Sequence, residues 1–384
     1  MISIVNFNPQ CITYSQMNMI FNSRIFWKKL GIWTRSYIIG RYTGIGAEEE
    51  LFGRLYLESH DIGLLLRILF GRGTADGYAH NFDQLAITLR DLITAQLQGD
   101  QDAVVQNVDR LYQAVDASAA HLASINPYCN EEEWRSMLRD NLLYTLEDAN
   151  SLVANDFSAD AEAYDRLSEV SIRLGDFFAQ QMFNYITSGI EPQDGSECIT
   201  YDQMNEIYGV RMFWFELAVW VRNYMLSRYE GIGNPDEASA RLRQVLEDYV
   251  ARLRQFFGES PGADALMDEL YAFQDLLGDL ITAQMKGDEE EVDRITRLLY
   301  QNADDRAASV SSINPFWDQE EWRNRLYSNL RRTIEESESF LTEDYMKNID
   351  AFSMLLNLAD SASGYFAEGM FRYLISRQNE QIAG

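Results

Sequence analysis

The polar residues best spaced for chemistry form two matched sets, one in each half of the chain. Each set has an asparagine, a threonine four residues later and an acid three residues after that: Asn141, Thr145 and Asp148 in the first half, and Asn329, Thr333 and Glu336 in the second. Residues at i, i+4 and i+7 share one face of an α-helix. Each set predicts either a polar ligand pocket, an interhelical hydrogen-bond network or a solvated face.

Two further pairs of polar residues recur at matching positions. Asp91 and Asp279 are matched acids, and Arg35 and Arg222 are matched arginines in the pattern W-x-R. An arginine can hold a buried carboxylate or an anionic ligand, or it can lie along the helix surface and pair with an acid there. We include all four with the two sets above as candidate ligand-binding residues.

Signals for catalysis and for metal binding are weak. The histidines, His60, His80 and His121, have no glutamate three residues before them and no matching histidine in the second half, whereas di-iron bundles use Glu-x-x-His. Calcium-loop, nucleophile-elbow and phosphate-loop motifs are also missing from the sequence. We therefore predict no catalytic residues and no metal ligands, and the sequence identifies no cofactor.

A duplicated stretch indicates which elements position these residues. Residues 11–46 and 198–233 are identical at 20 of 36 positions at an offset of 187. Shared residues such as Trp27, Leu30, Trp33 and Tyr37 recur every three or four residues, which predicts one buried helical face. Thr13 is the predicted N-cap and Gly44 the start of the stop signal.

Helical periodicity continues through the chain, and we predict an all-α fold with essentially no sheet. The fold class is two tandem, homologous up-and-down helical bundles of about six helices each. The expected domains are 1–190 and 198–384, with a linker at 191–197. The predicted helices span 13–43, 47–70, 75–98, 101–123, 131–154, 158–188, 200–230, 236–257, 262–286, 289–311, 319–342 and 345–377.

Composition limits the partners. A formal net charge of −28 repels nucleic acids and anionic lipid, so we expect neither nucleic acid nor membrane as a partner. Three cysteines, Cys11, Cys129 and Cys198, are too few for a disulfide framework, and a cytoplasmic location is expected. The first ten residues lack the pattern of a signal peptide.

Several of these segments resemble a family of bacterial all-α proteins found notably in spore-forming Firmicutes. The resemblance rests on WTRSYI at 33–38, on NADDRAASVSSINPFW at 302–317 and on the acid pair after Thr145 and Thr333. Members of this poorly characterised family are often a single module with histidines on the first, third and fifth helices. The resemblance implies that the fold is kept here and that any role of those histidines is lost. The residues at their places are Leu30, Leu85 and Asn141, and Leu217, Phe273 and Asn329.

Together these observations favour a non-enzymatic binding or scaffolding protein built from duplicated bundles. The alternative is a protein that binds a small molecule or a divalent cation in one polar pocket per bundle. The sequence is compatible with binding to a protein partner, with self-association and with binding of a small ligand.

Overall fold

A computed structural model of the chain describes residues 8, 10–154, 156–188 and 197–383. The described residues are almost entirely helical, which confirms the all-α prediction. The predicted linker at 191–197 lies outside them apart from Glu197, as does most of the segment examined for a signal peptide. The helices are α1 (Tyr14–Thr43), α2 (Glu48–Phe70), α3 (Arg72–Gln98), α4 (Gln101–Ile125), α5 (Glu131–Val153), α6 (Phe157–Thr187), α7 (Tyr201–Tyr229), α8 (Pro235–Phe257), α9 (Pro261–Lys286), α10 (Glu289–Ile313), α11 (Gln319–Leu341) and α12 (Tyr345–Ala383).

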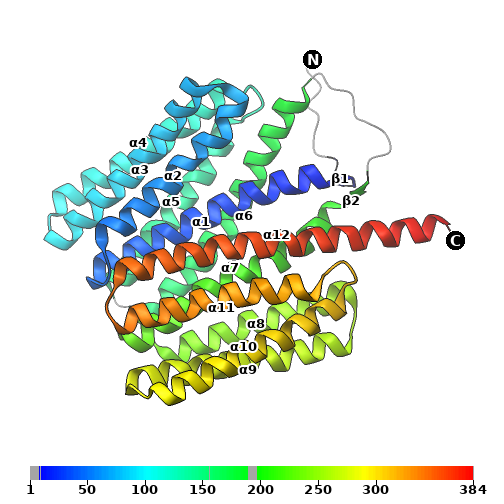
Figure 1. The fold of residues 1–384 in the computed structure, drawn as a ribbon. Helices are drawn as coiled ribbons and strands as arrows, with labels where there is room; N and C mark the ends of the chain where they lie inside the picture. The colour runs from blue at the N-terminus through cyan, green and yellow to red at the C-terminus, as the bar shows by residue number, and fades with distance from the viewer. Residues whose placement is uncertain (1–7, 9, 155, 189–196, 384) are drawn as a thin grey trace. The chain divides into compact units, whose positions relative to one another are not determined.

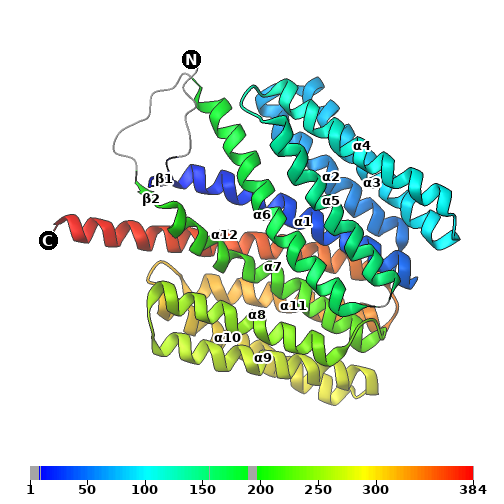
Figure 2. The same cartoon turned by 180° about the vertical axis from the view of Figure 1, so that it is seen from behind.

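The described chain forms two compact units. Unit 1 contains α1 to α6, and unit 2 contains α7 to α12 together with the short segment that ends at Ile12. Within unit 1, each helix packs against the next along the chain, and α1 also contacts α5 and α6. Unit 2 has the same order of neighbours, with α7 against α12. Figures 1 and 2 show the consecutive helices of each unit lying side by side.

The ends of the longest repeated helix follow from local chemistry. Thr13 accepts a hydrogen bond from the backbone of Gln16, and the Gln16 side chain accepts one from the Thr13 backbone, which completes a capping box. Gly44 ends α1 in the left-handed conformation, at φ 70°, which glycine adopts without steric cost. Thr200 and Gln203 form the same capping box at the start of α7. The predicted N-cap and C-terminal stop of α1 are confirmed.

The repeated tryptophans lie in the cores. Trp27 is 2% exposed and packs edge-on against Trp134, with ring centroids 5.6 Å apart. In unit 2, Trp214 stacks on Trp322 at 5.5 Å. Because large aromatic side chains remove the most apolar surface from water, these contacts fix α1 against α5 and α7 against α11.

Two of the cysteines form a bond that the sequence analysis does not predict. Cys11 and Cys198 form a disulfide, with Cα atoms 5.1 Å apart across a sequence separation of 187. Cys11 directly precedes β1 (Ile12–Thr13), and Cys198 is the first residue of β2 (Cys198–Ile199), with which β1 pairs. The strand pairing brings together two cysteines whose partnership neither their number nor their separation indicates. Cys129 is free, and burial, with Glu133 and Glu131, raises the pKa of its thiol to about 12.

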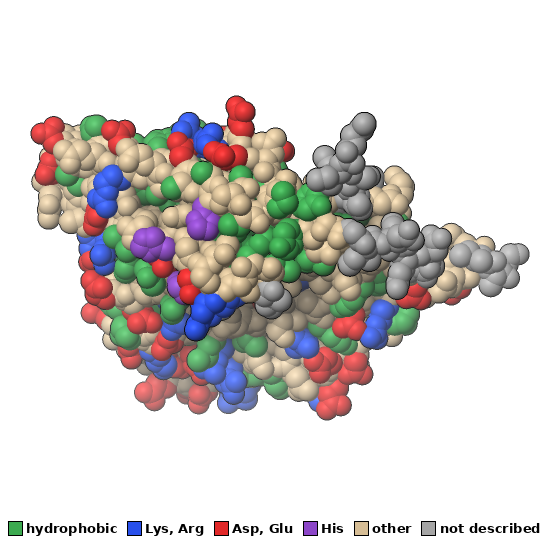
Figure 3. All heavy atoms as spheres, turned by 90° about the horizontal axis from the view of Figure 1, so that it is seen from above, with side chains coloured by type: hydrophobic (Ala, Val, Ile, Leu, Met, Phe, Trp, Pro, Cys, Tyr) green, Lys and Arg blue, Asp and Glu red, His purple; other side chains and the backbone are tan. Residues whose placement is uncertain are grey.

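The surface is mixed in charge. On the face shown in Figure 3, acidic and basic side chains are interspersed, and histidine side chains are exposed among them. No helix among the described residues is long and apolar enough to cross a membrane.

Candidate functional site

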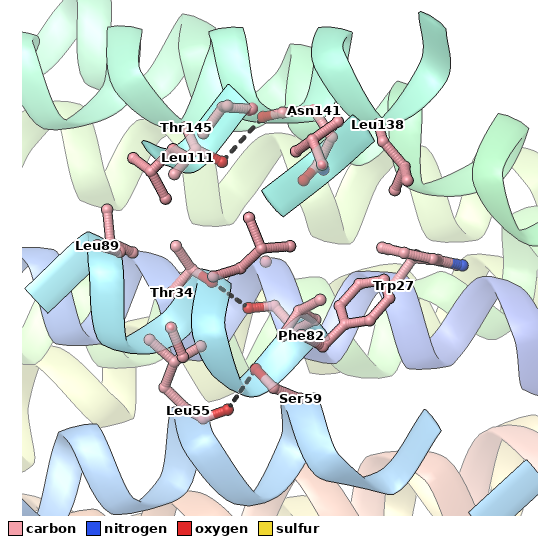
Figure 4. Close-up of a pocket in the computed structure, with 16 residues that line it drawn as sticks. Trp27, Thr34, Leu55, Ser59, Phe82, Leu89, Leu111, Leu138, Asn141 and Thr145 are labelled. Atoms are coloured by element: carbon pink, nitrogen blue, oxygen red, sulfur yellow. Dashed lines mark hydrogen bonds between the residues drawn. The ribbon is translucent and has the colours of Figure 1, made fainter. Parts of the chain in front are cut away.

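A cavity of about 80 Å³ lies inside unit 1 (Figure 4). Five helices, α1 to α5, line it, and most of the lining is apolar. The lining residues are Trp27, Leu30, Gly31, Thr34, Leu55, Ser59, Phe82, Leu85, Ala86, Leu89, Leu111, Val115, Leu138, Asn141, Leu142 and Thr145. Protein interiors rarely leave space larger than one water molecule, so a cavity of this size is a distinctive feature of the bundle.

Four polar residues interrupt the apolar lining. Thr34 on α1, Ser59 on α2 and Thr145 on α5 each donate their hydroxyl hydrogen to the carbonyl four residues earlier in the same helix, at 2.8 to 2.9 Å. Their oxygens keep lone pairs that can accept a hydrogen bond. The Asn141 side chain is half-buried and makes no hydrogen bond with another described residue. The lining therefore offers three acceptors and one free carboxamide.

The three predicted polar residues of α5 lie in two different places, the cavity and a buried charge cluster. Asn141 and Thr145 face the cavity, as their spacing of one helical turn allows. Asp148, three residues further on, does not line it. Its side chain is fully buried and lies 3.7 Å from Arg35 Nε. The predicted set is one helical face, but only its first two members reach the cavity.

Arg35 is the centre of a buried charge cluster. It is 7% exposed and binds Asp160 on α6 through both Nε and Nη2, with Nε 3.2 Å from Oδ1. Burial would lower the pKa of Arg35, but Asp160 and Asp148 raise it above its ordinary value. The arginine is therefore buried, and it holds the protein's own carboxylates.

One guanidinium faces two carboxyl groups in this cluster. Burial raises the pKa of Asp148 well above its usual range; Arg35 opposes that rise and Asp160 adds to it. No hydrogen-bond donor satisfies either oxygen of Asp148 among the described residues. A proton shared with Asp160 would give the cluster one negative and one positive charge, which is the favourable state in a medium of low dielectric constant.

The corresponding cluster in unit 2 has one carboxyl group. Arg222 donates to Glu336, which is fully buried. Burial raises the pKa of Glu336, and Arg222 opposes that rise. Asn348 stands 188 residues after Asp160, is buried, and donates to the Glu336 carbonyl at 3.3 Å. An uncharged amide thus occupies the place of the second acid, which supports a single carboxylate charge beside Arg35 in the unit 1 cluster.

The raised pKa of Asp148 predicts a pH dependence for unit 1. An acid whose pKa is higher in the folded state stabilises folding below its unfolded pKa, about 3.9, and that contribution is lost as pH rises through the folded value. Asp148→Asn should therefore reduce the loss of unfolding free energy between pH 4 and neutral pH. Hydrogen exchange of α1, α5 and α6 amides across this range measures the difference between variant and wild type, and parallel curves would contradict the prediction.

The matched acids Asp91 and Asp279 are outside both clusters. Asp91 pairs with Arg110 on the surface at 3.2 Å, and Asp279 is exposed. Neither lines the cavity or approaches the buried arginine of its unit. Both acids lie on a solvated helix face, and their role as ligand-binding residues stays a prediction.

Unit 2 carries a different lining at the corresponding positions. Asn329 and Thr333 are kept, and Thr333 donates to the Asn329 carbonyl at 3.1 Å. Five other positions have larger side chains and two have smaller ones. Ala218, Val221, Leu246, Phe273 and Gln274 replace Gly31, Thr34, Ser59, Leu85 and Ala86, while Leu270 and Ala303 replace Phe82 and Val115. Phe273 is 3% exposed and lies under the Arg306 guanidinium at 4.6 Å.

Another group of reactive side chains lies at Asp83. His60 Nδ1 and the Tyr56 hydroxyl both lie within 3.3 Å of one oxygen of this buried carboxylate, and the His60 ring itself is exposed. Among the described residues, no group of three or more histidine, cysteine, aspartate or glutamate side chains is arranged to hold a metal ion.

Comparisons of the chain with models of protein families, with curated proteins and with solved structures found no match. The positions that the family resemblance links to histidines in unit 1, Leu30, Leu85 and Asn141, all line the cavity. Three helices thus direct these positions to one place. Sequence reasoning found Asn141 and Thr145 but missed Thr34 and Ser59, because the second half has no matching polar residue for either.

Proposed function

We propose that the protein is a binding protein and that unit 1 holds a small molecule in its cavity. The observation that supports this most is that unit 1 has a cavity at positions where five of the seven differing residues are larger in unit 2. The cavity measures about 80 Å³ and is partly open to solvent, with Leu30, Leu85 and Asn141 half-buried at its wall. Unit 2 has larger residues at five of the corresponding positions. A void with a free carboxamide at its wall is therefore better explained as a ligand site than as a packing defect.

The lining favours binding over catalysis. None of its residues is an acid, a histidine, a lysine or a cysteine, so no general acid or base faces the space. The three hydroxyl groups donate to backbone carbonyls and have no adjacent base that would activate them. A molecule held here would be enclosed and oriented by this wall.

Filling the cavity tests the proposed function. In Leu85→Phe, unit 1 receives the side chain that unit 2 has at the matching position. We expect this variant to keep its helical content and to lose binding of small molecules detected by ligand-observed NMR. The reciprocal change in unit 2, Phe273→Leu, is the matched control and should leave binding unchanged. Equal binding by wild type and Leu85→Phe would contradict a ligand site in this cavity.

Gly31 gives a second, smaller prediction at the cavity wall. A β-carbon added to Gly31 meets no atom within 4 Å, so Gly31→Ala should stabilise α1 by about 0.8–1 kcal/mol through helix propensity alone. At Gly63, by contrast, the added carbon would lie 2.8 Å from the Ala79 β-carbon, and Gly63→Ala should destabilise. Thermal unfolding of the two variants compares them; destabilisation by Gly31→Ala would show that the space is not open.

Three broader expectations accompany this proposal. We propose that the units arose by duplication of one helical bundle, supported by the shared offsets of 187 and 188, and that they belong to the bacterial family that the sequence resembles. A scaffolding role stays a prediction. The cytoplasmic location predicted from composition also remains a proposal, and the Cys11–Cys198 disulfide instead favours an oxidising compartment.

A further inference from the structure

We infer that the ligand of the unit 1 cavity is a small uncharged molecule with a short apolar body and a primary amide group. This inference rests on the proposed function, because it specifies the chemistry of the molecule that the cavity binds. Three properties of the lining support it: the absence of charge, the arrangement of the polar atoms, and the size of the space.

The first property excludes an ionic ligand. No lining residue is charged, and most of the lining is apolar. The buried charged residues next to the lining residues on α1 have partners of their own: Lys28 donates to Ser168, and Arg35 binds Asp160. An ion moved from water into this space would lose its hydration without gaining a counter-charge, which is strongly unfavourable.

The second property selects an amide among uncharged groups. The Asn141 carboxamide has one acceptor and two donor hydrogens with no partner among the described residues, so it can exchange two hydrogen bonds with a second amide. The hydroxyl hydrogens of Thr34, Ser59 and Thr145 are already donated to carbonyl groups of their own helices. The hydroxyl oxygens can therefore only accept a hydrogen bond from a ligand. A primary amide has two N–H hydrogens and one carbonyl oxygen. It can therefore donate to the hydroxyl oxygens and can both donate to and accept from the Asn141 carboxamide. An alcohol brings one donor and leaves part of the wall unsatisfied.

The third property limits the ligand's size. An engineered apolar cavity of roughly 150 Å³ binds benzene, which has six carbon atoms. In the same proportion, a space of about 80 Å³ encloses about three non-hydrogen atoms, and the polar end of a slightly longer molecule would lie at the half-buried Asn141. The leucine side chains of four helices would surround its apolar end, while Asn141 would bind its polar end.

A series of probes of nearly constant size tests this inference on the full-length protein. Propionamide, 1-propanol, propionate and propylammonium share a short alkyl chain and differ in the polar group. We expect ligand-observed NMR titration to give a Kd for propionamide about tenfold lower than for 1-propanol, since an extra net hydrogen bond contributes about a factor of ten. The two ions should bind at least a hundredfold more weakly than propionamide.

Variants at Asn141 separate recognition from folding. Asn141→Leu should weaken propionamide binding about tenfold and change 1-propanol binding less than threefold. Asn141→Asp keeps the shape of the side chain and adds a negative charge, so it should make propylammonium the preferred probe. Asn329→Leu alters the matching residue of unit 2 and should change no Kd.

The possible results distinguish the two proposals. Tighter binding of propionate, propylammonium or 1-propanol than of propionamide would overturn the amide assignment and leave the cavity as a ligand site. Unchanged preference in both Asn141 variants would overturn it as well. If no probe bound and Leu85→Phe were indistinguishable from wild type, the proposed function and this inference would fall together.

Discussion

Replacing both Asp148 and Asp160 with asparagine is expected to destabilise unit 1 by about 3–5 kcal/mol, the usual cost of leaving a buried charge without its partner. Arg35 is 7% exposed, and the two carboxyl groups are those whose charges raise its pKa. With both neutral, the guanidinium would stay buried without a counter-ion. Hydrogen exchange of the α1, α5 and α6 amides measures the unfolding free energy of this unit.

Single substitutions give the controls for this prediction. Asp148→Asn leaves the two-point contact between Arg35 and Asp160, so at neutral pH it should be neutral or stabilising. Asp91→Asn removes a surface acid that pairs with Arg110 and should change stability by less than about 1 kcal/mol. A double variant as stable as the wild type would show that Arg35 does not depend on these two acids.

Breaking the disulfide is expected to have an effect of similar size. The disulfide joins residues separated by 187 positions and so restricts the unfolded chain. For a loop of this length, the lost conformational entropy of the unfolded state should stabilise the fold by about 5 kcal/mol. Because the loop encloses α1 to α6, the loss in Cys11→Ser/Cys198→Ser should fall on the unfolding of unit 1. Urea unfolding of the variant and of the oxidised wild type measures it.

Thiol counting gives an independent check of the disulfide. The oxidised wild type should show one reactive thiol in denaturant, that of Cys129, and reduction should raise the count to three. Cys129→Ser is the control variant, and it should leave the stabilisation by the disulfide intact. Three thiols in protein purified without reductant would contradict the bond.

The sequence predicts the helices well because their signals are local. Capping residues such as Thr13 and the left-handed Gly44 act within one turn, so α1 begins within one residue of the predicted position and ends at it. The buried tryptophans follow equally directly from helical periodicity. Long-range features are different, since the partnership of Cys11 with Cys198 depends on a strand pairing with almost no local sequence signal.

The sequence predicts only two of the four polar residues that line the cavity. Comparing the two halves selects residues that they share, and it therefore finds Asn141 and Thr145. The cavity, however, is formed by residues in which the halves differ, such as Thr34 against Val221 and Ser59 against Leu246. Asp160 was overlooked in the same way, because its counterpart is Asn348.

The disulfide also determines what a protease would leave behind. Cys11 precedes α1 and Cys198 follows α6, so the disulfide closes residues 11–198, which include α1 to α6, into a covalent ring. A single cut at the exposed turn of Gly99 and Asp100 would give new chain ends between α3 and α4 without releasing a fragment. The disulfide would keep the two pieces covalently joined until a reductant was added.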